Sequence, residues 1–211
     1  LLNDLTFKLF FNETQRVTIE YGDKESGVNK KLYYISKEKI ENFENVEWSE
    51  YTGAFNIDPN GNYIIYAKVT DMVGNYSIIS SDGVVIDNIA PQLSVNDKDI
   101  YCGEVKVKVT DDNLDYLTVD DEKVEVENGE IKLLGKEEPQ VIAVYDKAGN
   151  KTEISVTVNK DHTFEDSKVT TPASVTEEGV KTYYCKYCDK TKTEPIKKLA
   201  PQITEGINCK F

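Results

Sequence analysis

Residues 105–110 read Val-Lys-Val-Lys-Val-Thr, a strict alternation of apolar and polar side chains. Residues 154–159, Ile-Ser-Val-Thr-Val-Asn, repeat this pattern, and residues 124–127, Val-Glu-Val-Glu, give a shorter case. Successive side chains of a β-strand point to opposite faces of its sheet, so this period places the apolar residues in a core and the polar ones in solvent. The pattern predicts half-buried strands.

Other segments rich in Val, Ile, Tyr and Thr suit the same pleated surface. They predict further strands at residues 16–21, 31–36, 63–70, 84–87, 131–134 and 141–145. Only residues 36–45 have helical spacing, because Ile40 and Phe43 lie three apart behind a candidate Ser36 cap. Many short strands and one short helix indicate an all-β fold of antiparallel β-sandwiches.

An internal repeat divides the chain. Residues 69–75, Val-Thr-Asp-Met-Val-Gly-Asn, align with residues 144–150, Val-Tyr-Asp-Lys-Ala-Gly-Asn. Gly and Asn tolerate positive φ and Asp can bind the backbone of a turn, so both copies are predicted to be hairpin connectors. A second echo, Ala-Pro-Gln at residues 90–92 and 200–202, predicts domain junctions, because proline cannot donate to a strand ladder.

These marks predict four segments. They are a β-sandwich over residues 1–90, a second and shorter one over 91–160, a small Cys-x-x-Cys β module over 161–199, and a linker or the start of a further domain over 200–211. The chain begins at Leu1 without a leader, and we expect it to be a monomeric segment of a longer protein.

The composition excludes several functions. The 25 Lys and Arg residues against 38 Asp and Glu give a net charge of −13, which repels a phosphate backbone, so we expect no nucleic-acid partner. No apolar run approaches the length of a membrane span. With a single histidine, His162, and no Gly-x-Ser-x-Gly, His-Glu-x-x-His or phosphate-loop motif, we expect no enzyme.

The pair Cys185 and Cys188 is the sharpest chemical feature. Two thiolates at Cys-x-x-Cys spacing can face one zinc ion, and His162 could add an imidazole, so these three residues are candidate metal ligands and zinc the only candidate cofactor. A structural zinc uses four ligands. Cys209 could be the fourth, although it lies beyond the junction at Pro201. A Cys185–Cys188 disulfide is the alternative in an oxidising exterior.

Three further features each leave two interpretations. Cys102 precedes a strand and is expected to be a small buried apolar residue, or to pair with Cys209 if the modules fold back. Acidic clusters could bind calcium or be solvated loops. They lie at Asp97/Asp99, Asp111/Asp112/Asp115 and Asp120/Asp121/Glu122. Five aromatic residues could form a sugar-stacking platform or pack in the core. They are Tyr33, Tyr34, Trp48, Tyr51 and Tyr76.

Two resemblances add to these observations. The strings at residues 63–75, 80–87 and 90–91, with Ser-Gly-Val at 26–28, resemble bacterial immunoglobulin-like repeats of Gram-positive surface proteins. Residues 101–150 resemble the shorter relative that often follows. Residues 162–199 resemble a small Cys-x-x-Cys module of Firmicutes surface proteins, although Val175 stands where that family usually has a further cysteine.

The resemblances imply tandem immunoglobulin-like β-sandwiches and a non-catalytic role. The chain is expected to be a structural or adhesive segment of a secreted or cell-wall-anchored bacterial protein. It would act as a spacer or as a module that binds a protein or glycan at the cell surface, without entering a membrane. The alternative is a carbohydrate-binding accessory of a secreted glycan-active enzyme.

Overall fold

The computed structural model describes residues 7–58, 60–136 and 138–201. Strands and turns make up all the regular structure of these residues, and none of them is helical. The all-β prediction is therefore confirmed. Within the described residues, no helix has the length and apolar character that crossing a bilayer requires.

The chain divides into two compact units. The first comprises Leu1–Ser94, Lys108–Gly129 and Ile142–Glu153, and the second comprises Val95–Val107, Glu130–Val141 and Ile154–Phe211. The domain boundaries predicted near residues 90, 160 and 199 stay predictions. Of the predicted terminal segment 200–211, residues 202–211 lie outside the described residues, and Cys209 lies there with them.

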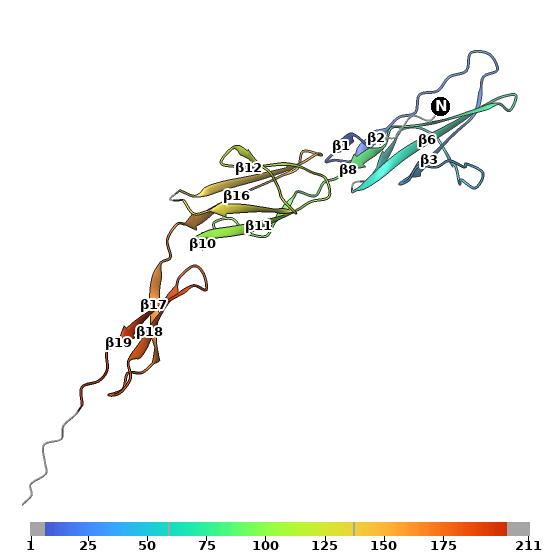
Figure 1. The fold of residues 1–211 in the computed structure, drawn as a ribbon. Coiled ribbons are helices and arrows are strands. Elements are labelled where there is room, and N and C mark those ends of the chain that lie inside the picture. Colours follow the sequence, from blue (N-terminus) through green and yellow to red (C-terminus); the bar gives the residue numbers. More distant parts are fainter. Residues whose placement is uncertain (1–6, 59, 137, 202–211) are drawn as a thin grey trace, which may run out of the picture. The chain divides into compact units, whose positions relative to one another are not determined.

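Two sheets lie in the first 90 residues (Figure 1). The larger has the order β1 (Leu9–Phe11), β8 (Val84–Ile86), β6 (Gly61–Asp71), β3 (Val28–Ser36), β4 (Ser49–Glu50), and β7 (Tyr76–Ser80) also pairs with β6. β1 runs parallel to β8, with Phe10 beside Val85. The smaller sheet pairs β2 (Gln15–Val17) with β5 (Phe55–Ile57) in antiparallel fashion.

Strand β6 is buried on both faces. On one face, Ile65 packs with Ile57 and Ile86 in an apolar cluster. On the other face, Tyr66 is fully buried, because the Phe43 ring lies 5.3 Å from it and the Ile40 amide donates to its hydroxyl at 2.8 Å. Burial of one such large apolar side chain stabilises the fold by about 1.5–3 kcal/mol.

The helix predicted over residues 36–45 is absent, and that prediction was wrong. The Glu38 amide donates to the Ser36 hydroxyl at 3.2 Å, and the Glu44 amide donates to the Asn42 side-chain oxygen at 2.9 Å. The first of these bonds is one that a Ser36 cap would make, but a helix would also need the Ile40 and Glu44 amides for carbonyls four residues earlier. The Tyr66 hydroxyl takes the Ile40 amide and the Asn42 side chain takes the Glu44 amide, so Ile40 and Phe43 cover β6 from an irregular segment.

Both copies of the repeated turn form the predicted connector. The Asp71 amide donates to the Asn75 carbonyl at 2.9 Å between β6 and β7, and the Asp146 amide donates to the Asn150 carbonyl at 3.2 Å in the second copy. Gly74 and Gly149 have φ of 100° and 90°, values that favour glycine.

Two sheets follow along the chain. One has the order β10 (Ile100–Cys102), β16 (Lys151–Asn159), β15 (Gln140–Asp146), β12 (Leu114–Val119), β13 (Glu122–Val124), and the other β14 (Glu130–Leu134), β11 (Glu104–Thr110), β9 (Gln92–Leu93). The alternation predicted over residues 105–110 is confirmed on β11, where Val107 and Val109 are buried while Lys106 and Lys108 are exposed. This alternation is the pattern of a strand with one face in the core of a β-sandwich.

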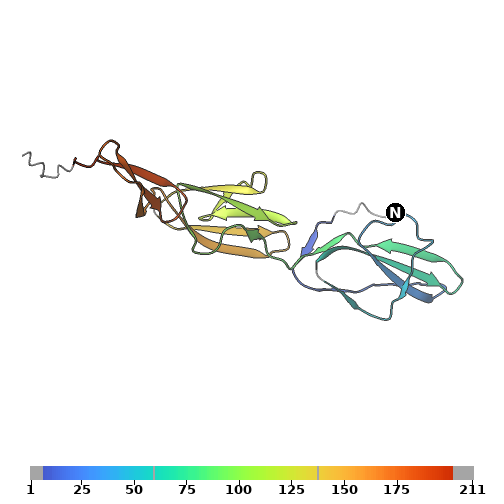
Figure 2. The same cartoon turned by 90° about the horizontal axis from the view of Figure 1, so that it is seen from below.

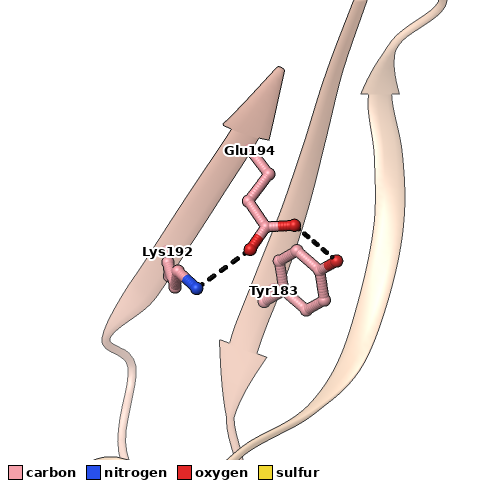
Figure 3. Close-up of polar contacts among 3 residues, drawn as sticks. All are labelled: Tyr183, Lys192 and Glu194. Carbon is pink, nitrogen blue, oxygen red and sulfur yellow. Dashed lines mark hydrogen bonds and ion pairs between the residues drawn. The ribbon is translucent and has the colours of Figure 1, made fainter. Parts of the chain in front are cut away.

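The last sheet is a three-stranded antiparallel meander of β17 (Phe164–Thr171), β18 (Gly179–Cys185) and β19 (Thr191–Ile196) (Figures 1 and 2). Its buried residues are few: only Gly179, Thr182 and Cys185 of its strands. Polar contacts join its surface side chains, since the Glu194 carboxylate accepts from the Tyr183 hydroxyl and from Lys192, each at 2.9 Å (Figure 3).

Candidate metal centre

Cys102 ends strand β10 and is 7% exposed. β10 runs parallel to β16, and its register sets Cys102 beside Asn159. The next residue, Gly103, has φ of 79° and donates its amide to the Asn159 carbonyl at 2.7 Å. The end of β10 is therefore fixed against the end of β16.

His162 lies three residues beyond the end of β16, on the way to β17. Since Cys102 sits beside the last residue of β16, the chain leaving that strand passes the cysteine within a few residues. The His162 Nδ1 atom lies 3.1 Å from the Cys102 sulfur. The parallel pairing of β10 with β16 thus brings together two residues that are 60 positions apart in the sequence.

Cys185 ends β18, and Cys188 lies in the turn that leads to β19. The antiparallel register of β17 and β18 sets Cys185 opposite Phe164. Two backbone bonds hold the turn: the Cys185 amide donates to the Lys190 carbonyl and the Lys186 amide to the Thr163 carbonyl, both at 2.9 Å. This register delivers the Cys-x-x-Cys turn beside His162.

The four side chains converge on one point. The ligand atoms of Cys102, His162, Cys185 and Cys188 all lie within 4.8 Å of one another. The Cys102 sulfur is 3.1 Å from the Cys188 sulfur and 3.5 Å from the Cys185 sulfur, and the Cys188 sulfur is 3.3 Å from His162 Nδ1. Ligand atoms around a tetrahedral zinc would be about 3.5–3.8 Å apart.

The structure brings the three candidate ligands His162, Cys185 and Cys188 together and adds Cys102. No sequence signal identified this fourth residue, because the pairing of β10 with β16 cannot be read from the sequence. Cys102 is buried, as expected of a small apolar residue, but its sulfur faces the other three groups. All three described cysteines carry free thiols.

Two thiols of the cluster have very different pKa values. Burial, with hydrogen bonds to Cys188 and Cys185, raises the pKa of the Cys102 thiol to about 12. Burial also acts to raise the pKa of Cys185, but hydrogen bonds from the Tyr187 amide and from His162 outweigh it and bring the pKa to about 6. The thiolate is the form of cysteine that binds metals and attacks electrophiles.

Carboxylates of Asp87, Asp111 and Asp146 form a second cluster of titratable groups. Side-chain amides donate hydrogen bonds to this cluster. Asn150 Nδ2 donates to the Asp146 carboxylate at 2.6 Å and to the Asp87 carbonyl at 2.7 Å. Asn113 Nδ2 donates to the Asp87 carboxylate at 2.6 Å. Of the predicted acidic cluster at 111–115, only Asp111 takes part. This arrangement anchors the repeated turn to the Asp87 segment.

Other acidic residues cap the backbone. Asp97 accepts from the Ser155 amide at 2.9 Å, and Asp99 accepts from the Asn96 amide and the Tyr101 hydroxyl at 2.9 Å each. These bonds give the Asp97/Asp99 pair a structural role.

The five aromatic residues do not form one platform. Alternation along β3 puts Tyr33 and Tyr34 on opposite faces: Tyr33 stacks on Phe55 at 4.2 Å, and Tyr34 contacts Trp48 at 6.4 Å. Tyr51 is buried. Tyr76 is 63% exposed, and the Lys68 ammonium lies 4.4 Å from its ring and 5.7 Å from that of Trp48. A small group remains of the predicted platform: the exposed Tyr76 with the half-buried Trp48 and Lys68.

No family model and no curated protein matches this chain. The solved structures that resemble it include fibronectin(III)-like modules of Clostridium thermocellum CbhA, at 14% identity over 75% of this chain and 93% of that one, with a TM-score of 0.31. SGBP-B of the Bacteroides ovatus mixed-linkage glucan utilization locus, solved with a mixed-linkage heptasaccharide, matches at 11% identity over 95% of this chain, with a TM-score of 0.30. This chain covers 60% of that protein.

The FN1–FN3 domains of chicken CNTN1 match at 13% identity over 88% of this chain and 81% of that one, with a TM-score of 0.30. At such low identities and TM-scores these likenesses carry no conclusion about function. The fold rests on the strands themselves. They form an all-β chain of the β-sandwich class, to which fibronectin type III and immunoglobulin-like modules belong.

Proposed function

We propose that this chain is a non-catalytic structural segment of an extracellular bacterial surface protein. The observation that carries the proposal is the closure of its Cys/His cluster: the ligand atoms of the four side chains lie within 4.8 Å of one another, and four is the full ligand number of a tetrahedral site. Catalytic metal sites instead keep a coordination position open for water or substrate. The segment would space other domains or present its loops to a protein partner.

The other cluster supports the same role. The carboxylates of Asp87 and Asp146 are buried, and amide side chains from Asn113 and Asn150 occupy them. A general acid or base needs an accessible proton position beside a substrate. An apolar groove of about 600 Å³ is lined by residues such as Leu9, Ile57 and Ile79 and by no residue of either cluster.

A glycan array tests this proposal against the carbohydrate-binding alternative. Exposed aromatic rings stack on sugars, and the group of Trp48, Lys68 and Tyr76 favours that second candidate. Specific binding that Tyr76→Ala abolishes would overturn the spacer role. The matched control is Tyr21→Ala, because Tyr21 is 48% exposed and also has an ammonium, from Lys31, 4.6 Å from its ring. We expect no glycan to be bound.

A further inference from the structure

We propose that Cys102, His162, Cys185 and Cys188 bind one zinc ion, and that this ion fastens the β17-β18-β19 sheet to the end of β10. The inference rests on the same cluster that carries the proposed function and deepens it by naming the ion that the cluster holds, whereas the glycan array tests the spacer role separately. It assigns a ligand role to Cys102, and it gives the Cys-x-x-Cys turn a structural purpose.

The donor set fits zinc. Three thiolates and one imidazole form one of the ligand sets that closed structural zinc sites use. Calcium and magnesium take oxygen ligands, and none of the four groups offers one. Sulfur and nitrogen donors in a four-atom cage select zinc or another soft, tetrahedral ion.

Direct hydrogen bonds do not explain the geometry. His162 Nδ1 lies 3.1 Å from the Cys102 sulfur and 3.3 Å from the Cys188 sulfur. A ring nitrogen has either one hydrogen or one lone pair in the ring plane, so it cannot serve two sulfurs well at once. A cation at the centre of the cage gives all four atoms the same partner.

A disulfide explains the geometry less well. The cluster holds three thiols, so any disulfide within it leaves one cysteine over. The Cys185–Cys188 disulfide would leave Cys102, which is 7% exposed, facing two oxidised sulfurs. One zinc ion engages every member of the cluster.

The sheet that these residues fasten needs such support. Seven of the eight residues of β17 are exposed, and three residues of β18 are buried. Segments below about 40 residues generally need a disulfide, a metal or a partner, because they bury too little apolar surface. A metal bound by the cluster would support this sheet directly, since Cys185 ends β18 and His162 lies just before β17.

Metal analysis of the tag-free full chain tests the proposal. We expect one zinc per chain, and we expect Cys102→Ser to lower the zinc content at least tenfold under dilute chelator. Cys209→Ser is the matched control, and it should retain full zinc content. Loss of zinc in Cys209→Ser but not in Cys102→Ser would assign the fourth position to Cys209 and overturn the ligand set.

Cobalt substitution keeps the test decisive if Cys102→Ser binds metal weakly or folds poorly. Cobalt in a tetrahedral thiolate site has an ultraviolet charge-transfer band that grows with the number of thiolates. The wild-type band should correspond to three thiolates, and the Cys102→Ser band should be about one third weaker. A band of two thiolates in the wild type would overturn the proposal. So would a zinc-free folded chain whose intact mass is two hydrogens short, because that mass indicates a disulfide.

Discussion

At the scale of the residue, one aspartate in each repeated turn organises the surrounding backbone. Asp71 accepts from the Val73 and Asn75 amides, and Asp146 accepts from the Asn150 amide. The two turns differ in burial, because Asp71 is half-buried while Asp146 is 3% exposed. The same five-residue motif should therefore matter more in its second copy.

We expect Asn150→Ala to destabilise the chain by about 1–3 kcal/mol, because it removes the side-chain donor that serves the buried Asp146 carboxylate and the Asp87 carbonyl. The matched control is Asn75→Ala, which removes a bond to the half-buried Asp71 and should cost clearly less. Denaturant unfolding of both variants measures the difference. Equal losses would contradict this account.

For Asp111 we expect substitution to raise stability, whereas substitution of Asn150 lowers it. Burial raises the pKa of its carboxyl, the Asn113 amide opposes this, and the charges of Asp146 and Asp87 add to the rise. A raised carboxyl pKa means that ionisation costs stability, so the cost is absent below the unfolded value of 3.8 and appears as pH rises through the folded pKa.

Asp111→Asn should therefore increase the free energy of unfolding at pH 7 by about 0.5 kcal/mol, which would be seen as a higher Tm. This gain should vanish near pH 3.5. Thermal melts in chelator across this range measure it. Asp112→Asn, a change of the exposed neighbouring carboxylate, should show no such gain. A lower Tm for Asp111→Asn at pH 7 would mean that its charge is favourable.

At the scale of the element, the three-stranded sheet is bound by surface contacts as much as by its core. Hydrogen bonds from Lys192 and Tyr183 lower the pKa of the Glu194 carboxyl (Figure 3). A lowered carboxyl pKa contributes stability that is present above the unfolded value of 4.5 and is lost as pH falls through the folded pKa.

Glu194→Gln should lower the stability of this sheet at pH 7, modestly because the group is exposed, and less at high salt. Its difference from the wild type should shrink as pH falls below 4.5. Hydrogen exchange at β18 and β19 across pH measures this, and Glu178→Gln, at an exposed position nearby, is the control. A pH-independent difference would rule out the ion pair as its cause.

Elements with a strong period were predictable from the sequence, and pairings were not. The alternation of Val107 and Val109 sufficed to place β11, and the motif ending in Asn150 sufficed to place a turn. The helix expected behind Ser36 failed because the Tyr66 hydroxyl, distant in sequence, takes the Ile40 amide. Cys102 was missed as a site residue for the same kind of reason, since its role depends on the register of β10 with β16.

At the scale of the whole molecule, the proposed zinc predicts that stability is unevenly distributed. Removing the ion should lower amide protection in β17, β18 and β19 by at least tenfold, while β6, with a core of its own, keeps its protection. Hydrogen exchange with and without chelator measures this, and zinc but not magnesium should restore protection. Loss of protection throughout the chain would show that the ion does not act locally.

The two parallel strand pairs, β1 with β8 and β10 with β16, have a mechanical consequence. In each pair the earlier strand enters at the end opposite to that from which the later strand leaves. Tension along the chain would then shear the two strands past each other, loading their hydrogen bonds together rather than opening them one at a time. Cys102 and His162 lie where β10 and β16 end, so an ion held between them would cross-link this second strand pair and resist the shear.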